Sequence, residues 1–166
     1  MGHSPIWRQI IWGNGVFRGV QHINLDAKGR LAIPARQREP LLSQCAGQLV
    51  VTIDVQTKCL VIYPLPEWER VAQDIESLPS LKYAVRRFQR LVLGYATDVE
   101  LDGSGRMLLP PSHREYARLE KKVVLVGQGK KLELWAEDRW LAECEQALED
   151  SGPEAELPEE LQSLRF

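Results

Sequence analysis

Two short segments of the sequence place an aspartate and an arginine four positions apart around a glycine. Residues 25–34 read LDAKGRLAIP, and residues 101–110 read LDGSGRMLLP. The planar guanidinium of an arginine can bind a carboxylate, a phosphate or a guanine edge through two parallel hydrogen bonds. An aspartate held four residues earlier can orient that guanidinium. Each segment therefore has the chemistry of a turn that binds an anion or reads a base.

Catalysis is a poor explanation for the same residues. Neither segment holds a nucleophile beside a general base, and Ser104 of the second copy corresponds to Lys28 of the first. The sequence has no phosphate-binding loop of the form GxxxxGK[ST]. The three cysteines, Cys45, Cys59 and Cys144, form no CxxC pair and have no histidine at metal-ligand spacing. We therefore predict that the chain is not an enzyme and has no cofactor or metal site.

The aspartates and glycines have a structural explanation that needs no ligand. Asp26 and Gly29 occupy the first and fourth positions of a predicted type I turn, where a left-handed residue such as glycine is favoured at the end. Asp102 and Gly105 occupy the same positions in the second segment. We assign these four residues to turn formation. A turn alone does not explain why an arginine follows in both copies.

Recognition of double-stranded DNA gives the repeated arginine a reason. A projecting pair of strands fits the major groove of a duplex, which is about 12 Å wide, and arginine suits guanine O6 and N7. On this hypothesis Arg30 and Arg106 contact guanine edges or phosphates. Lys28, inside the first turn, adds a contact to the DNA backbone.

The two segments belong to a longer internal repeat. At an offset of 76 residues, seven of the fifteen positions in 25–39 match those in 101–115. Runs rich in Val, Ile, Leu and Tyr that are bounded by turn residues predict strands. Each copy is predicted to contain a strand, a turn and a strand, over 20–33 and 96–109. A short helix, two further strands and a second helix are predicted to follow in each copy.

The repeat predicts the division of the chain. We expect a first module over 16–80, a linking helix over 81–95 and a second module over 96–148. Residues 1–15 are interpreted as an extension that does not belong to the fold. Residues 149–166 are predicted to form a flexible acidic tail, because they hold one Lys/Arg against six Asp/Glu.

The net charge of −2 hides a slightly basic body. Residues 16–148 contain 19 Lys/Arg and 17 Asp/Glu, so the overall charge does not argue against DNA binding. No run of 18 apolar residues is present, and no membrane span is expected. In the linking helix, Lys82, Arg86 and Arg90 share one face with Arg87 beside them. That face is either a solvated surface or one that contacts phosphate or a partner.

From Phe17 to about Leu148 the chain resembles the MraZ family of bacterial transcriptional regulators. The resemblance depends on FRG at 17–19, on DAKGR and DGSGR at their separation, and on the segment from Tyr63-Pro64 to Trp68. It implies an α+β fold of tandem swapped-hairpin (AbrB-like) β-barrel modules with flanking helices. It also implies a homo-oligomeric ring.

The resemblance further implies a repressor of the bacterial division and cell-wall gene cluster. Family members bind G-rich direct repeats of double-stranded DNA upstream of their own operon, so a cytoplasmic location at the nucleoid is expected. Carried over to this sequence, the DNA-binding candidates are Lys28, Arg30 and Arg106, with Arg18 as a further candidate beside the first hairpin. The alternative from another class is a homo-oligomeric assembly scaffold that binds no nucleic acid.

Overall fold

The computed structural model describes residues 16–165, and the predicted extension over 1–15 lies outside the described residues. The first half consists of β1 (Val20–Asn24), β2 (Arg30–Ala32), α2 (Ala35–Cys45), β3 (Gln48–Ile53), β4 (Leu60–Pro64) and α3 (Leu65–Glu76). After α4 (Tyr83–Tyr95), the second half consists of β5 (Thr97–Glu100), β6 (Arg106–Leu108), α5 (Pro111–Tyr116), β7 (Lys122–Gly127), β8 (Leu132–Ala136), α6 (Glu137–Asp150) and α7 (Glu159–Gln162). The predicted mixture of helices and strands is confirmed.

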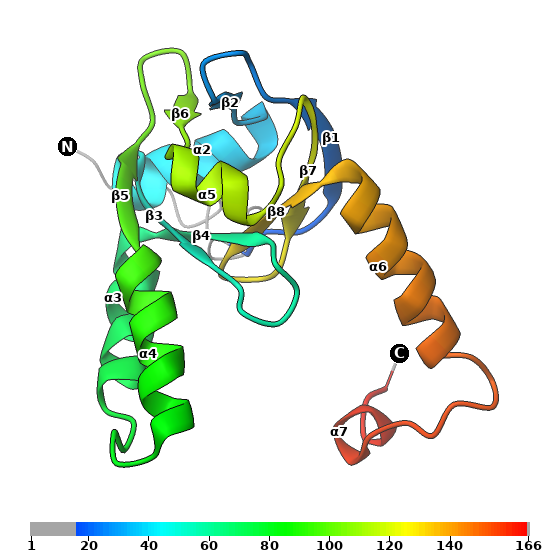
Figure 1. The fold of residues 1–166 in the computed structure, drawn as a ribbon. Coiled ribbons are helices and arrows are strands. Elements are labelled where there is room, and N and C mark those ends of the chain that lie inside the picture. Colours follow the sequence, from blue (N-terminus) through cyan, green and yellow to red (C-terminus); the bar gives the residue numbers. More distant parts are fainter. Residues whose placement is uncertain (1–15, 166) are drawn as a thin grey trace.

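The strands form two antiparallel sheets in which the halves of the chain are interleaved (Figure 1). The larger sheet has six strands in the order β1-β7-β8-β4-β3-β5, and β2 pairs with β6 in the smaller one. Both edge strands of the large sheet pair with a strand of the other half, β1 with β7 and β5 with β3. Neither half therefore contains all the partners of its own strands.

In this pairing, neither predicted strand-turn-strand unit forms a simple two-stranded hairpin. Each predicted strand-turn-strand unit is paired only beside its turn, where Leu25 bridges Leu31 in the first copy. The two strands then separate, one joining the large sheet and the other the small sheet. Local alternation of apolar residues specifies which face a strand buries but not which strand it pairs with.

The six-stranded sheet is open, with β1 and β5 as its edges. A closed barrel is therefore not seen among the described strands. The predicted swapped-hairpin modules and their boundaries remain a prediction. Two elements can be located against those boundaries: α4 lies within the predicted linking helix, and α6 continues to Asp150, into the predicted tail.

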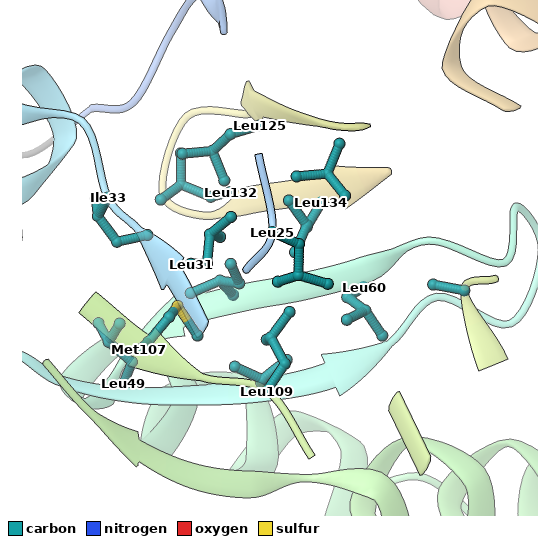
Figure 2. Close-up of a cluster of buried hydrophobic side chains, with 14 of the residues drawn as sticks. Leu25, Leu31, Ile33, Leu49, Leu60, Met107, Leu109, Leu125, Leu132 and Leu134 are labelled. Atoms are coloured by element: carbon teal, nitrogen blue, oxygen red, sulfur yellow. The ribbon is translucent and has the colours of Figure 1, made fainter. Parts of the chain in front are cut away.

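One hydrophobic core joins the two sheets (Figure 2). Leu31 of β2 and Met107 of β6 are 0% and 1% exposed and lie with Leu49 and Leu125 of the large sheet in one cluster. The central strands are buried almost throughout, because helices also cover their other face. There, Trp135 of β8 packs edge-on against Trp140 of α6.

The helices α3, α4 and α6 extend from the body on the side away from the two turns (Figure 1). Thr52 of β3 donates a 2.6 Å hydrogen bond to the carbonyl oxygen of Val92, which ties α4 to the sheet. Gln89 of α4 donates to the carbonyl oxygen of Ile75 and so joins α4 to α3. Among residues 16–165, no helix is long and apolar enough to cross a membrane.

Because Leu31 is fully buried between the two sheets, Leu31→Ala is expected to lower the free energy of unfolding by about 2–5 kcal/mol. Leu108→Ala is the matched control in the same pair of strands, β2 and β6, since Leu108 is 57% exposed. It should change that free energy by less than about 0.5 kcal/mol. Urea denaturation followed by circular dichroism measures both, and equal losses would contradict this description of the core.

Candidate nucleic-acid interface

The first turn is organised by one aspartate. Oδ1 of Asp26 accepts hydrogen bonds from the backbone N–H of Lys28 at 2.9 Å and of Arg30 at 2.8 Å. The carbonyl oxygen of Asp26 accepts a third bond, at 3.0 Å, from the N–H of Gly29. Gly29 has a φ of 83°, in the left-handed region that favours glycine. This is the turn geometry that the sequence predicts.

The second turn repeats the first almost atom for atom. Oδ1 of Asp102 accepts from the backbone N–H of Ser104 at 2.8 Å and of Arg106 at 2.9 Å. The N–H of Gly105 donates to the carbonyl oxygen of Asp102 at 2.9 Å, and the φ of Gly105 is 73°. The two turns thus differ mainly in the side chain at the tip, which is exposed Lys28 in one and exposed Ser104 in the other.

Each aspartate also orients the arginine that follows the turn. Nε of Arg30 donates to Oδ2 of Asp26 at 2.8 Å, and Nε of Arg106 donates to Oδ2 of Asp102 at 3.2 Å. Within residues 16–165, neither arginine donates a hydrogen bond from its two terminal nitrogens. Those nitrogens are the groups that form bidentate contacts with guanine or phosphate.

The pairing of β2 with β6 brings the two arginines onto one surface. Arg30 lies opposite Leu108, and Ala32 lies opposite Arg106. Because side chains alternate across a strand, these four residues share the outer face while Leu31 and its partner point into the core. We call this outer face the recognition face. Arg30 and Arg106 are diagonal neighbours on it, about 7–8 Å apart by the usual spacing of such pairs.

Each turn is also supported by a hydrogen bond from the other half of the chain. The N–H of Ile33 donates to the carbonyl oxygen of Gly105 at 3.0 Å, and the N–H of Leu109 donates to that of Gly29 at 2.9 Å. As a result each turn is fixed by the opposite repeat. Both turns project from the same end of the body (Figure 1).

Two further arginines lie against the turns, and no role for them is predicted from the sequence. A Cβ on Gly29 would lie 2.6 Å from Cζ of Arg114, and a Cβ on Gly105 would overlap Cδ of Arg38. Arg38 and Arg114 therefore pack on the turn of the other repeat. The signal for them is the pair Arg38-Glu39, which recurs as Arg114-Glu115 at the 76-residue offset.

The remaining candidate, Arg18, is not brought to this surface. Gly127 N–H donates to the carbonyl oxygen of Gly19, and the backbone of Phe17 pairs with that of Gly129. Arg18 therefore lies beside the turn between β7 and β8, at the end of β1 opposite to Asp26. The structure brings together Lys28, Arg30 and Arg106 but leaves Arg18 apart.

One group of side chains resembles a metal-ligand set. The ligand atoms of Asp54, Cys59 and Glu133 lie within 4.8 Å of one another. Burial, with smaller effects from the two carboxylates, raises the pKa of the Cys59 thiol to about 12. One oxygen of Asp54 already accepts two backbone N–H bonds in the turn between β3 and β4. This arrangement suits a turn that holds a protonated thiol.

The two turn glycines should not tolerate a side chain. Gly29→Ala and Gly105→Ala each place a Cβ in a left-handed conformation and against an arginine, so each should lower the free energy of unfolding by about 1–3 kcal/mol. Gly103→Ala is the control, because Gly103 has no positive φ and no atom within 4 Å of its added Cβ. Urea denaturation compares the three variants, and a loss for Gly103→Ala as large as the others would refute this explanation.

The turn aspartates should make stability depend on pH in the acid range. The backbone N–H of Arg30 is the main group that lowers the pKa of Asp26 below its ordinary value of 3.8, and that of Arg106 acts alike on Asp102. A lowered pKa in the folded state stabilises the fold above the ordinary pKa, and that contribution is lost as the pH falls through the folded pKa.

The variant Asp26→Asn/Asp102→Asn lacks both titrating groups. Its melting temperature should therefore fall less than that of the unaltered chain between about pH 5 and pH 3. Thermal unfolding by circular dichroism over this range provides the measurement. Parallel curves for the two proteins would show that the aspartates are not the groups responsible.

Comparison with known proteins agrees with the repeated organisation. The family model described as "MraZ protein, putative antitoxin-like" matches residues 16–91 and again residues 92–157. The transcriptional regulator MraZ of Pseudomonas aeruginosa (strain LESB58) is 54% identical over 149 residues, which cover 90% of this chain and 99% of that protein. Those of Coxiella burnetii (strain Dugway 5J108-111) and Halorhodospira halophila are 55% and 52% identical over 150 residues, with the same coverage. The chain belongs to the MraZ family.

Proposed function

We propose that this chain is a sequence-specific DNA-binding repressor that acts on the bacterial division and cell-wall gene cluster. Its targets would be G-rich direct repeats of double-stranded DNA upstream of its own operon. The observation that carries the proposal is the recognition face, where Arg30 and Arg106 are diagonal neighbours on paired strands. The two turns that precede these strands project from the same end of the body (Figure 1). The relatives' name, transcriptional regulator, supports a role in transcription and not in catalysis.

The dimensions and chemistry of the recognition face suit the major groove. A two-stranded ribbon enters a groove of about 12 Å, and its outward side chains meet the base edges. In each arginine, Nε is held by an aspartate, so the guanidinium is oriented before DNA is bound. An oriented donor loses less conformational entropy on binding than a free one. Lys28, at the tip of the first turn, is placed to reach a phosphate.

We also propose an AbrB-like swapped-hairpin arrangement and a homo-oligomeric ring. The exchange of β1 and β5 between the halves supports the first proposal. Support for the second comes from apolar side chains left exposed on α4 and in the loop between α3 and α4: Leu78, Leu81, Tyr83, Phe88 and Leu91. Exposed large apolar side chains in one region of the chain favour association with another chain. Repeated recognition faces in one ring would then engage successive repeats of the DNA.

The alternative is an assembly scaffold, and the exposed apolar side chains favour it as much as they favour a ring. Two arginines of the basic face of α4 have a cation–π partner within the same helix. The guanidinium carbons of Arg86 and Arg87 lie 5.6 Å and 4.7 Å from the ring centroid of Tyr83. Salt separates the two functions. The logarithm of the affinity of a DNA complex falls linearly with the logarithm of the salt concentration as counterions are released, whereas a scaffold changes size with salt and shifts no DNA.

A repressor of this kind would reside in the cytoplasm at the nucleoid.

Loss of either recognition arginine should weaken DNA binding without unfolding the chain. Arg30→Ala and Arg106→Ala should each weaken the free energy of DNA binding by about 1–3 kcal/mol per recognition face, because a bidentate contact is lost. Arg70→Ala is the matched control, since Arg70 is paired with Glu67 and Asp74 on α3, which extends from the body on the side away from both turns (Figure 1). Fluorescence anisotropy on a duplex from the native upstream region measures the change. Unchanged affinity in a folded Arg30→Ala protein would exclude this assignment.

A further inference from the structure

The two turns occupy equivalent places in the fold, so their surroundings can be compared residue by residue. The N–H of Leu25, just before the first turn, donates to the carbonyl oxygen of Lys121 at 2.8 Å. The N–H of Leu101, just before the second, donates to that of Gly47 at 2.9 Å. One residue farther from each turn, Asn24 lies opposite Lys122 and Glu100 lies opposite Gln48.

The charges at these equivalent places differ. The first-turn side, defined as Lys28, Lys121 and Lys122, presents three exposed lysines. Their counterparts on the second-turn side are Ser104, Gly47 and Gln48, none of which is charged. An acidic difference on the paired strands also favours the first turn, because exposed Glu100 stands where the first copy has the neutral Asn24.

Nearby charges do not cancel this difference. The segment 118–122 adds Arg118 and Glu120 to the two lysines, whereas the equivalent segment 44–48 contains no charged residue. Strand β5 also exposes Asp98 at the position where β1 has His22. Among the described residues, neither carboxylate of β5 has an ion-pair partner.

We propose that the two turns contact DNA unequally, with the first-turn side binding the phosphate backbone and the second-turn side reading the groove through Arg106. This inference rests on the proposed DNA binding. Fields from surface charges decay over about 8–10 Å in physiological salt, so the groups nearest each turn decide its attraction to phosphate. A carboxylate such as Glu100 close to a phosphate opposes binding. The recognition face, although nearly symmetric in its arginines, therefore has one preferred direction on a duplex.

The lysines of the first-turn side can be tested against a matched pair at the other end of the same strand. Lys121→Gln/Lys122→Gln removes two charges beside the first turn, and Lys130→Gln/Lys131→Gln removes two charges between β7 and β8. The first variant should raise the Kd for the native upstream duplex about tenfold and flatten the slope of log K against log salt by about 0.9 per lost phosphate contact. The second should change neither measurably.

A gain of affinity provides the opposite test. Glu100→Asn/Ser104→Lys gives the second-turn side the residues that the first copy has at these two positions, so binding should tighten about tenfold and the salt slope should steepen. Melting temperatures check that each variant is folded. Equal losses from the two lysine pairs, or no tightening in the symmetrised variant, would overturn the inference while leaving DNA binding intact. Failure of the unaltered chain to bind the duplex would instead overturn the proposed function, and this inference with it.

Discussion

The pairing of β2 with β6 is the contact on which the recognition face depends. Each strand has only three residues, and each comes from a different half of the chain. The middle residues, Leu31 and Met107, are fully buried and fix the ribbon on the core. This antiparallel register places Arg30 and Arg106 on the same outer face, and a slip of one residue would turn one strand's side chains to the other face. Weakening the β2–β6 pair would therefore separate the two arginines and also loosen the hydrogen bonds that Ile33 and Leu109 donate to the turn glycines.

The exchange of contacts between the two halves extends beyond β2 and β6. Each half supplies an edge strand to the other, and each turn glycine is packed by an arginine from the other repeat. A repeat of this kind is not two independent units joined by a helix, because each set of strands completes its hydrogen bonds in the other half. The halves therefore present their turns as a single rigid surface, which suits recognition of a fixed DNA geometry.

The turns could be predicted from the sequence because their chemistry is local. Asp26 and Gly29 contact only residues within four positions through their defining hydrogen bonds, so a short motif contains all that is needed. The partners of β1 and β2 could not be predicted, because alternation fixes the buried face and leaves the pairing open. The packing role of Arg38 could not be predicted for a related reason. Its contact with Gly105 joins residues far apart in the sequence, and position in a helix does not reveal it.

On the proposed function, the two turns and the lysines beside the first turn meet the DNA, and the helices α3, α4 and α6 do not. Hydrogen–deuterium exchange of the full chain, with and without the native upstream duplex, tests it most directly. Slower amide exchange is expected in segments 26–32 and 102–108 when DNA is bound, with α3, α4 and α6 unchanged at constant oligomeric state. Protection confined to α4, with both turns unaffected, would contradict it.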